Sequence, residues 1–254
     1  MRADPPFRSS PGAAEGATLA IEAATPRGSV ALVRDGALLA EVLLPAGIQV
    51  SASYVPALAE LFARAGDVPV ARVAVSAGPG SFTGLRVGLA AAKGLCLPSR
   101  LPLVPVPTLE ALALAAREVP EGAVVCPVLD ARKKELYCAA FVFGGGAGEL
   151  RRLLPDAPLP PSRLLSLLPP EGAVLFLGDG VDACAPLLSE ALGPRALLAP
   201  PESRYPRAWT VGLLGERIGR GGGDGDSASV LPRYLRRPEA EEAAAAPPLR
   251  PPPF

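Results

Sequence analysis

The chain of 254 residues contains no histidine, and no asparagine occurs anywhere in its sequence. Without histidine the chain cannot form a Ser-His-Asp or Cys-His triad, a histidine general base or a zinc site with histidine ligands. Lysine plus arginine and aspartate plus glutamate both number 25, so the formal net charge is zero. No uniform basic field is therefore present to hold nucleic acid unaided.

The cysteines are widely spaced and form no Cys-x-x-Cys motif; they are Cys96, Cys126, Cys138 and Cys184. Because each stands among apolar neighbours, we expect buried free thiols in a reducing cytosol. The sequence contains no run of 18 or more apolar residues, so we expect no membrane-spanning helix. The first 16 residues lack the apolar segment of a signal peptide, and we therefore expect a cytoplasmic protein.

The order of the predicted elements repeats along the chain. Three strands, a helix, a strand and a helix occur twice, and the first strand of each copy ends in an acid, Glu22 or Asp130. Two stacked units of this kind are the plan of the actin, hexokinase and Hsp70 group of folds. We predict an α/β fold of two tandem actin-like subdomains (the ASKHA, ribonuclease-H-like plan), each a mixed sheet with helices.

The composition places the expected boundaries. Both ends of the chain are rich in proline and alanine and lack apolar periodicity, which favours disorder. The expected units are a disordered leader over 1–16, an N-terminal actin-like domain over 17–118, a C-terminal actin-like domain over 119–237 and a disordered tail over 238–254.

A glycine-rich run, Gly78-Pro79-Gly80-Ser81, connects a short apolar strand to a helix predicted over 81–97. Ser81 is the expected N-cap, and free backbone N–H groups at such a helix start suit an anion. The run lacks the Gly-Lys-Ser/Thr of a Walker A loop, and no acid follows about 20 positions later to bind a ribose. Two interpretations stay open: the glycines contact a phosphate, or they let the helix pack closely on its neighbours.

Three acids, Glu22, Asp130 and Asp179, follow predicted strands, where actin-like ATPases hold hydrated Mg²⁺. No glycine-rich hairpin follows Glu22, and three cations follow Asp130-Ala131. Each acid is better interpreted as the capped end of a strand, so we expect no catalytic residue, no metal site and at most weak ADP or ATP binding. The candidates for a vestigial nucleotide or phosphate loop are Gly78, Gly80, Ser81, Asp130 and Asp179.

Two predicted helices are unusually apolar. Over 51–65 the large side chains form one stripe that includes Tyr54, Leu58 and Phe62. The helix over 81–97 carries only two charges, Arg86 and Lys93. A helix of this kind is either buried or in contact with a partner subunit, and composition does not decide between the two.

The run from Gly78 to Gly88, followed by Ala92-Lys93-Gly94-Leu95, resembles the central motif of the bacterial TsaB (YeaZ) family. The stretches 19–25, 129–137 and 232–236 resemble three further family motifs, so the resemblance covers about residues 18–237. The chain departs from the family pattern at Glu22-Ala23-Ala24-Thr25, where Asp-Thr-Ser/Ala-Thr is usual, which weakens any nucleotide role of the first half.

The resemblance implies a two-domain actin-like pseudoenzyme. Members of the family pair with the related catalytic subunit TsaD, and with the ATPase TsaE, to install threonylcarbamoyl on the adenosine next to the anticodon of tRNA. The pairing surface is implied to come from the helices over 51–65 and 81–97, and it could support a homodimer when TsaD is absent. The expected interface residues are Tyr54, Leu58, Phe62, Leu85, Arg86 and Leu89.

Two other classes of function fit the residues less well. An active small-molecule kinase of the actin-like group would need a phosphate-binding hairpin after Glu22, and none is visible. A peptidase, a label attached to relatives of the family, would need a catalytic zinc site, for which histidines and paired cysteines are lacking.

Overall fold

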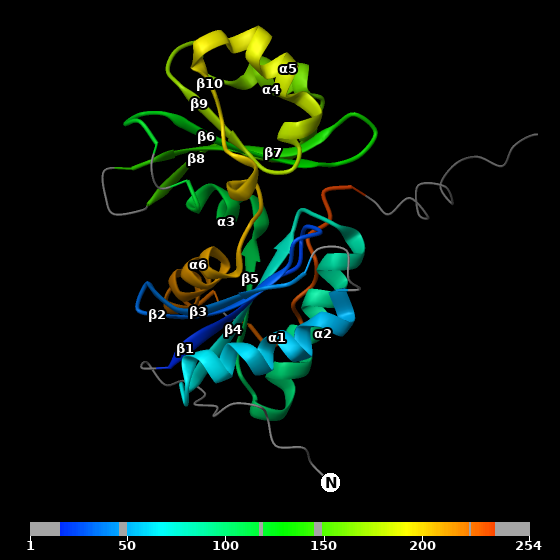
Figure 1. The fold of residues 1–254 in the computed structure, drawn as a ribbon, viewed down its shortest axis with the longest axis vertical. Helices are drawn as coiled ribbons and strands as arrows, with labels where there is room; N and C mark the ends of the chain where they lie inside the picture. Colours follow the sequence, from blue (N-terminus) through cyan, green and yellow to red (C-terminus); the bar gives the residue numbers. More distant parts are fainter. Residues whose placement is uncertain (1–15, 46–49, 117–118, 145–148, 224, 237–254) are drawn as a thin grey trace, which may run out of the picture.

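The computed structural model describes residues 16–45, 50–116, 119–144, 149–223 and 225–236 (Figure 1). Apart from Gly16, the predicted leader and tail lie outside these residues. Two five-stranded sheets form the framework. The first has the order β3-β2-β1-β4-β5, and its strands are β1 (Ala17–Glu22), β2 (Ser29–Arg34), β3 (Ala37–Leu43), β4 (Val70–Gly78) and β5 (Leu103–Pro107).

The second sheet repeats the plan of the first. Its order is β10-β9-β6-β7-β8, with β6 (Val124–Asp130), β7 (Leu136–Phe143), β8 (Leu150–Leu159), β9 (Val174–Leu177) and β10 (Ala196–Leu198). In each sheet the central strand pairs antiparallel with the next strand and parallel with the fourth, β1 with β2 and β4, and β6 with β7 and β9. The predicted duplication and the predicted fold class are therefore confirmed.

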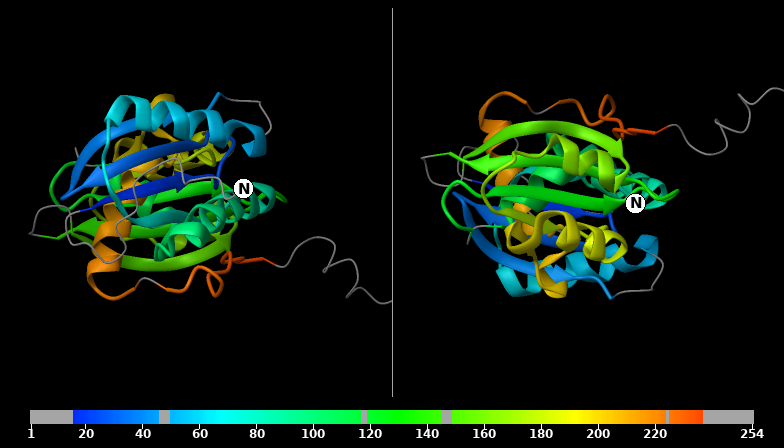
Figure 2. Two further views of the ribbon diagram at one scale, coloured as in Figure 1. Left: turned by 90° about the horizontal axis from the view of Figure 1, so that it is seen from below. Right: turned by 90° about the horizontal axis from the view of Figure 1, so that it is seen from above.

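Helices cover both faces of both sheets (Figures 1 and 2). Helices α1 (Val50–Ala65) and α2 (Phe82–Ser99) lie on the outer face of the first sheet, and α4 (Pro161–Leu167) and α5 (Val181–Leu192) lie on the outer face of the second. Between the sheets lie α3 (Thr108–Leu114) and α6 (Ala208–Arg220), which share two further buried clusters with the strands. Each sheet is thus buried on both sides, which explains its short, continuously apolar central strands.

The last of the described helices, α6, lies on the first sheet although it follows the second in sequence. Its Glu216 carboxylate accepts the N–H groups of Asp35 and Gly36, at 3.0 and 2.9 Å, in the tight turn between β2 and β3. At its other end, the Ala208 N–H donates to Ser29 Oγ at 2.8 Å. The expected division at residue 118 therefore separates the sheets but not the helices, and the domain boundaries stay a prediction.

The short helix after β5 differs from the expectation at its start. A threonine directly before the apolar run that starts at Leu109 predicts Thr108 as the N-cap of this helix, but Pro107 occupies that position and makes no side-chain cap bond. The Thr108 hydroxyl instead accepts the Gly78 N–H at 3.1 Å. A hydroxyl that accepts a buried backbone N–H from a neighbouring turn stabilises the fold more than one that caps a helix start. The reason is that the buried N–H would otherwise have no hydrogen-bond partner. The prediction also missed the strands β5 and β10.

Candidate functional site

The glycine-rich turn follows β4 and leads directly into α2. Ser81 is the N-cap as predicted, because its Oγ accepts the Gly84 N–H at 3.2 Å. The Ser81 N–H donates to the backbone oxygen of Ala24 at 2.7 Å, so this donor is engaged within the chain. A β-carbon at position 80 would lie 2.5 Å from the same oxygen. The loop after β1 therefore lies against the start of α2.

The next two glycines of the motif have the same surroundings. A β-carbon at position 84 would overlap the backbone oxygen of Ala23, and one at position 88 would lie 2.6 Å from the Ala23 β-carbon. Gly78 has a φ of +120°, which L side chains rarely adopt. These contacts favour the second interpretation of the motif, in which the glycines bring the helix into close contact with the loop after β1.

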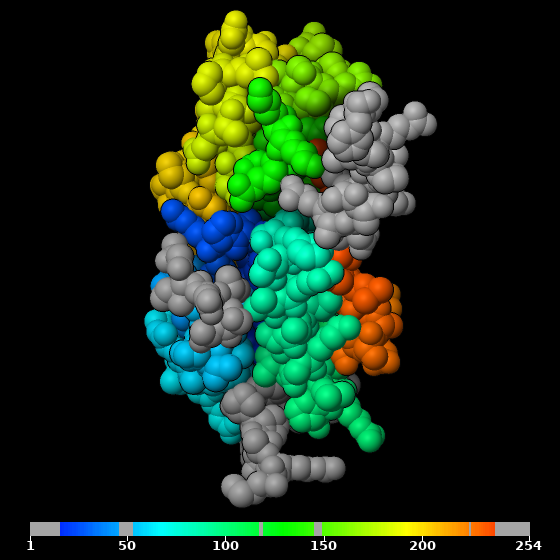
Figure 3. Space-filling model, turned by 90° about the vertical axis from the view of Figure 1, so that its right-hand side faces the viewer, coloured from blue at the N-terminus to red at the C-terminus, as the bar shows by residue number. Residues whose placement is uncertain are grey.

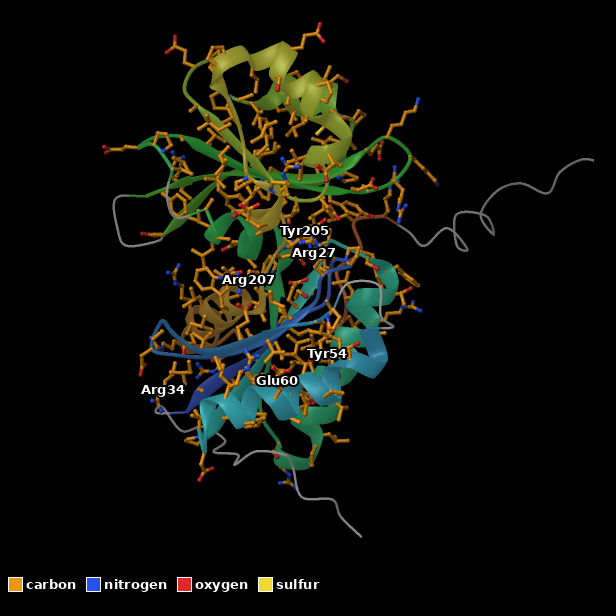
Figure 4. The ribbon with its side chains drawn as sticks, in the orientation of Figure 1. Arg27, Arg34, Tyr54, Glu60, Tyr205 and Arg207 are labelled. Carbon is orange, nitrogen blue, oxygen red and sulfur yellow. The ribbon has the colours of Figure 1, made fainter. Side chains whose placement is uncertain are left out.

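Glu22 ends β1 and is completely buried. Its Oε1 accepts the Ala24 N–H at 2.5 Å, and its Oε2 has no hydrogen-bond partner among the described residues. The Tyr54 hydroxyl, which points from α1 towards the sheet (Figure 4), donates to the Glu22 backbone oxygen at 2.8 Å. Burial raises the pKa of the Glu22 carboxyl to about 7. Such a carboxyl is part of the core and does not face solvent as a ligand of hydrated Mg²⁺ would.

The two other acids lie together in the second half of the molecule. The Asp130 N–H donates to Asp179 Oδ1 at 3.0 Å, which joins the ends of the neighbouring strands β6 and β9. Burial raises the pKa of Asp179. The candidate loop residues thus fall into two groups, with Gly78, Gly80 and Ser81 after β4 in the first half and the two aspartates in the second. Neither group is shown to bind a nucleotide.

The described part of the chain offers few side chains for metal binding or thiol chemistry. No group of three or more Cys, Asp or Glu side chains there is arranged to hold a metal ion. The four cysteines are free and buried, as expected, and burial raises the pKa of the Cys184 thiol to about 11. None of the described helices is long and apolar enough to cross a membrane.

Most of the expected interface residues point into the core, which corrects the predicted orientation of the two helices. Tyr54, Leu58, Leu85 and Leu89 are 1 to 7% exposed. The stripe of large side chains is broad because α1 packs on β2 and β3 and also on α2. Of the remaining candidates, Phe62 is half-buried and Arg86 is exposed. The pairing of these helices with a partner itself stays a prediction.

The opposite sides of the two helices form what we call the α1–α2 outer face. It consists of the exposed residues Val55, Ala59 and Ala63 of α1 and Ala90, Gly94 and Leu97 of α2. Val55 and Leu97 are 74% and 76% exposed, and a β-carbon at Gly94 would meet nothing within 4 Å. In Figure 3, α2 lies along the middle of the molecular face shown. These small residues also recur at helical spacing, so the sequence contained a pattern that could have identified this face. The predicted interface rests on the stripe of large side chains instead.

At the start of α2, the outer face is bordered by Arg86, which stacks on one aromatic ring and hydrogen-bonds to a second. The Arg86 guanidinium carbon lies 3.9 Å from the centre of the Phe82 ring. Its Nε donates to the Tyr234 hydroxyl at 2.9 Å, and the two rings are 5.1 Å apart. Tyr234 belongs to the C-terminal segment 225–236, whose part in this face the sequence did not reveal.

The C-terminal segment contacts both halves of the molecule. On the first half, the Arg233 N–H donates to the backbone oxygen of Ala77 at 2.7 Å. On the second, the Arg233 guanidinium lies 3.1 Å from an Asp156 oxygen, and Arg236 pairs with Glu135.

A second link between the halves does not involve the C-terminal segment. The Arg27 guanidinium lies 4.3 Å from the centre of the Tyr205 ring, and Figure 4 shows the two side by side between the halves.

Comparison with known proteins gives concordant results. The family model described as "TsaD: tRNA N6-adenosine threonylcarbamoyltransferase" matches residues 48–244. The tRNA threonylcarbamoyladenosine biosynthesis protein TsaB of Bacillus subtilis (strain 168) is 27% identical over 226 residues, which cover 88% of this chain and 95% of that protein. The TsaB protein of Escherichia coli (strain K12) is 35% identical over 126 residues, 48% of this chain and 54% of that protein.

The solved structure of YeaZ from Pseudomonas aeruginosa superimposes with a TM-score of 0.71 and 27% identity, covering 87% of this chain and all of that one. The family model covers well over half of the chain, and the curated relatives and the superimposed structure carry TsaB and YeaZ names. This chain therefore belongs to the TsaB/YeaZ family, within the wider family that the TsaD model describes.

Proposed function

We propose that this chain is a non-catalytic scaffold subunit that pairs with a TsaD homologue, and with the ATPase TsaE, in the threonylcarbamoylation of the adenosine next to the anticodon of tRNA. Its curated relatives are named for tRNA threonylcarbamoyladenosine biosynthesis. The proposal places the chain in the cytoplasm, with tRNA as a ligand of the assembled complex. The α1–α2 outer face is the observation that carries the pairing.

The composition of this face suits a contact between helix pairs. Its alanines and glycine let a second backbone approach closely, while Val55 and Leu97 offer apolar side chains to bury. The charged side chains of α1 there, Glu60 and Arg64, form an ion pair with each other. Because the chain matches the TsaD family model, we expect a TsaD homologue to offer a related helix pair, so that two helices from each subunit pack about a pseudo-twofold axis. The same geometry would allow a homodimer in the absence of TsaD.

The residues at the ends of the central strands support a role without catalysis. Glu22 is buried where an actin-like ATPase would expose an acid, and Ser81 donates its N–H to Ala24 instead of leaving it available to a phosphate. The sequence contains no histidine that could serve as a base or a metal ligand. These features also weigh against the kinase and peptidase alternatives.

A charge in the middle of the outer face should weaken pairing. Replacing Ala90 with aspartate would bury an unpaired carboxylate between the helices, because this exposed residue lies near the middle of α2. We expect a loss of at least about 2 kcal/mol, roughly a thirtyfold increase in the dissociation constant. The measurement is a calorimetric titration of the full chain with the TsaD homologue of the same organism.

The matched control is Ala183→Asp, which makes the same change at an exposed position of α5. This variant should bind the TsaD homologue as the wild type does. Equal affinity of the Ala90→Asp variant and the wild type would show that the pairing surface lies elsewhere. Leu58→Asp is unsuitable for this purpose, because Leu58 is 5% exposed and the charge would disrupt the core.

The isolated chain is expected to hydrolyse no ATP in the presence of Mg²⁺. The physical reason is that Glu22 is withdrawn into the core and the cations after Asp130 occupy the place of a compact glycine turn. Steady-state turnover measured with the purified chain tests this. Turnover that disappears in an Asp130→Ala variant would refute the non-catalytic part of the proposal.

A further inference from the structure

The turn between β6 and β7 holds three adjacent cations in an unusual backbone conformation. Arg132, Lys133 and Lys134 have φ angles of 63°, 51° and 62°. In this left-handed region the side chain of an L-residue crowds its own carbonyl group, so each of the three is held against a steric penalty. All three residues are exposed. Strain of this kind persists only where the surroundings impose it, and it is often found at ligand-binding sites.

Backbone bonds impose the conformation. The Ala131 N–H donates to the Glu135 backbone oxygen, and the Glu135 N–H donates to that of Arg132, both at 3.0 Å. Arg236 of the C-terminal segment donates to the Ala131 backbone oxygen at 3.0 Å and pairs with the Glu135 carboxylate. Neither the Arg132 nor the Lys134 side chain takes part in these bonds. The turn is thus fixed independently of the cationic groups that it presents.

The acids beside the turn are already engaged. Glu135 pairs with Arg236, and Asp130 Oδ1 accepts the Arg132 N–H at 2.8 Å. The Arg132 side chain approaches Asp130 only to 4.0 Å and is 85% exposed. With Arg236, the turn brings together four cations against the carboxylates of Asp130, Glu135 and Asp179, which leaves a small positive excess there in a chain without net charge.

The position of the turn distinguishes it from the pairing helices. It belongs to the second sheet, and in Figure 3 the bright green segment around residue 130 lies above α2 on the same molecular face. A subunit that packs on the α1–α2 outer face would thus leave the turn at the rim of the contact. Cations fixed at such a rim can reach a nucleic acid that the assembly holds.

We propose that the β6–β7 turn binds the phosphate backbone of tRNA, an inference that rests on the proposed function. Phosphate contacts need positioned cations but no base-specific groups, and a pre-formed turn loses little conformational entropy when it binds. The tRNA contact is favoured over an acidic protein surface because the turn lies outside the helix pair that faces the partner.

The test is an Arg132→Gly/Lys134→Gly double variant of the full chain. Glycine accepts positive φ without strain, so the melting temperature should stay equal or rise. The anisotropy of labelled, unmodified tRNA is followed on titration with the assembled complex at several salt concentrations. We expect the dissociation constant to increase about tenfold near 0.1 M salt, and the slope of its logarithm against log salt to fall by about 1.5.

The matched control is Arg100→Gly, because Arg100 is also an exposed arginine with positive φ, 51°, at the C-cap of α2. This variant loses a cation and a strained residue away from the turn, and its tRNA affinity should not change. An Arg132→Lys/Lys134→Arg variant keeps the charges and should bind as the wild type does.

Unchanged tRNA affinity and salt slope in the double variant would overturn the inference. Weaker binding of the TsaD homologue with unchanged tRNA affinity would also overturn it, since the turn would then contact an acidic surface of the partner. If the wild-type chain does not pair with the TsaD homologue, the proposed function fails instead. The same tRNA titration of the isolated full chain and its variants then decides whether the turn binds phosphates.

Discussion

Replacement of Gly84 by alanine is expected to destabilise the fold by roughly 4 kcal/mol, which is large for the addition of one methyl group. The new β-carbon would overlap the backbone oxygen of Ala23, and backbone has no side-chain rotamer through which it could move away. Either α2 or the loop after β1 would have to shift, and the bond from the Ser81 N–H to Ala24 would be strained with it. Chemical denaturation of the full chain, monitored by circular dichroism, measures the loss.

Gly94→Ala is the control in the same helix. A β-carbon at this position meets nothing within 4 Å, so alanine should raise stability by up to about 1 kcal/mol through its helix propensity. Opposite effects of the same substitution ten residues apart would show that the glycines of the motif serve close packing. A Gly84→Ala variant as stable as the wild type would refute this account of the motif.

Glu22→Gln should stabilise the protein at pH 8 by about 3 kcal/mol and leave its stability near pH 4.5 almost unchanged. Burial raises the pKa of the carboxyl from 4.5 to about 7. The folded state therefore holds this proton more tightly than the unfolded state. The stabilising contribution of the protonated acid is fully present below pH 4.5 and is lost as the pH rises to about 7. Glutamine mimics the protonated form at every pH, so the free energy of unfolding of the variant does not decrease in this way as the pH rises.

Denaturation curves of both proteins between pH 4.5 and 8 measure the effect, and the difference between them isolates Glu22 from other titrating groups. Glu216→Gln serves as the control because Glu216 is also buried, yet both its oxygens accept backbone N–H groups. An amide there would place an N–H against a donor and should lower stability by about 1–3 kcal/mol. A constant difference between wild type and Glu22→Gln across the pH range would contradict the assignment.

Much of the fold followed from local patterns. The pair Asp35-Gly36 predicts a tight turn, and both residues have positive φ, 51° and 77°. Ser81 caps α2 as the sequence predicts. The duplicated strand and helix order was sufficient to predict two actin-like sheets. These features depend on residues within a few positions of one another, where turn chemistry, capping and periodicity act directly.

The orientation of the two apolar helices was a different kind of problem. Helix α1 has large side chains such as Tyr54 and Leu58 on one side and Val55, Ala59 and Ala63 on the other, so each side carries an apolar stripe. Periodicity identifies the stripes but not which of them is buried, because that depends on the area a neighbouring element can cover. The sheet and α2 take the large side chains, and the small ones are left for the surface.

By itself, the sequence determined the fold class, the duplicated order of elements, the family and the absence of histidine chemistry. Only the tertiary structure decided that Glu22 is sealed in the core, that α6 returns to the first sheet and that the C-terminal segment contacts both halves. Such features depend on contacts between distant parts of the sequence. Glu216 and Gly36, for example, are hydrogen-bonded although they are 180 residues apart. No local pattern encodes such a contact, because its free energy exists only once the two sheets and the layer between them have assembled.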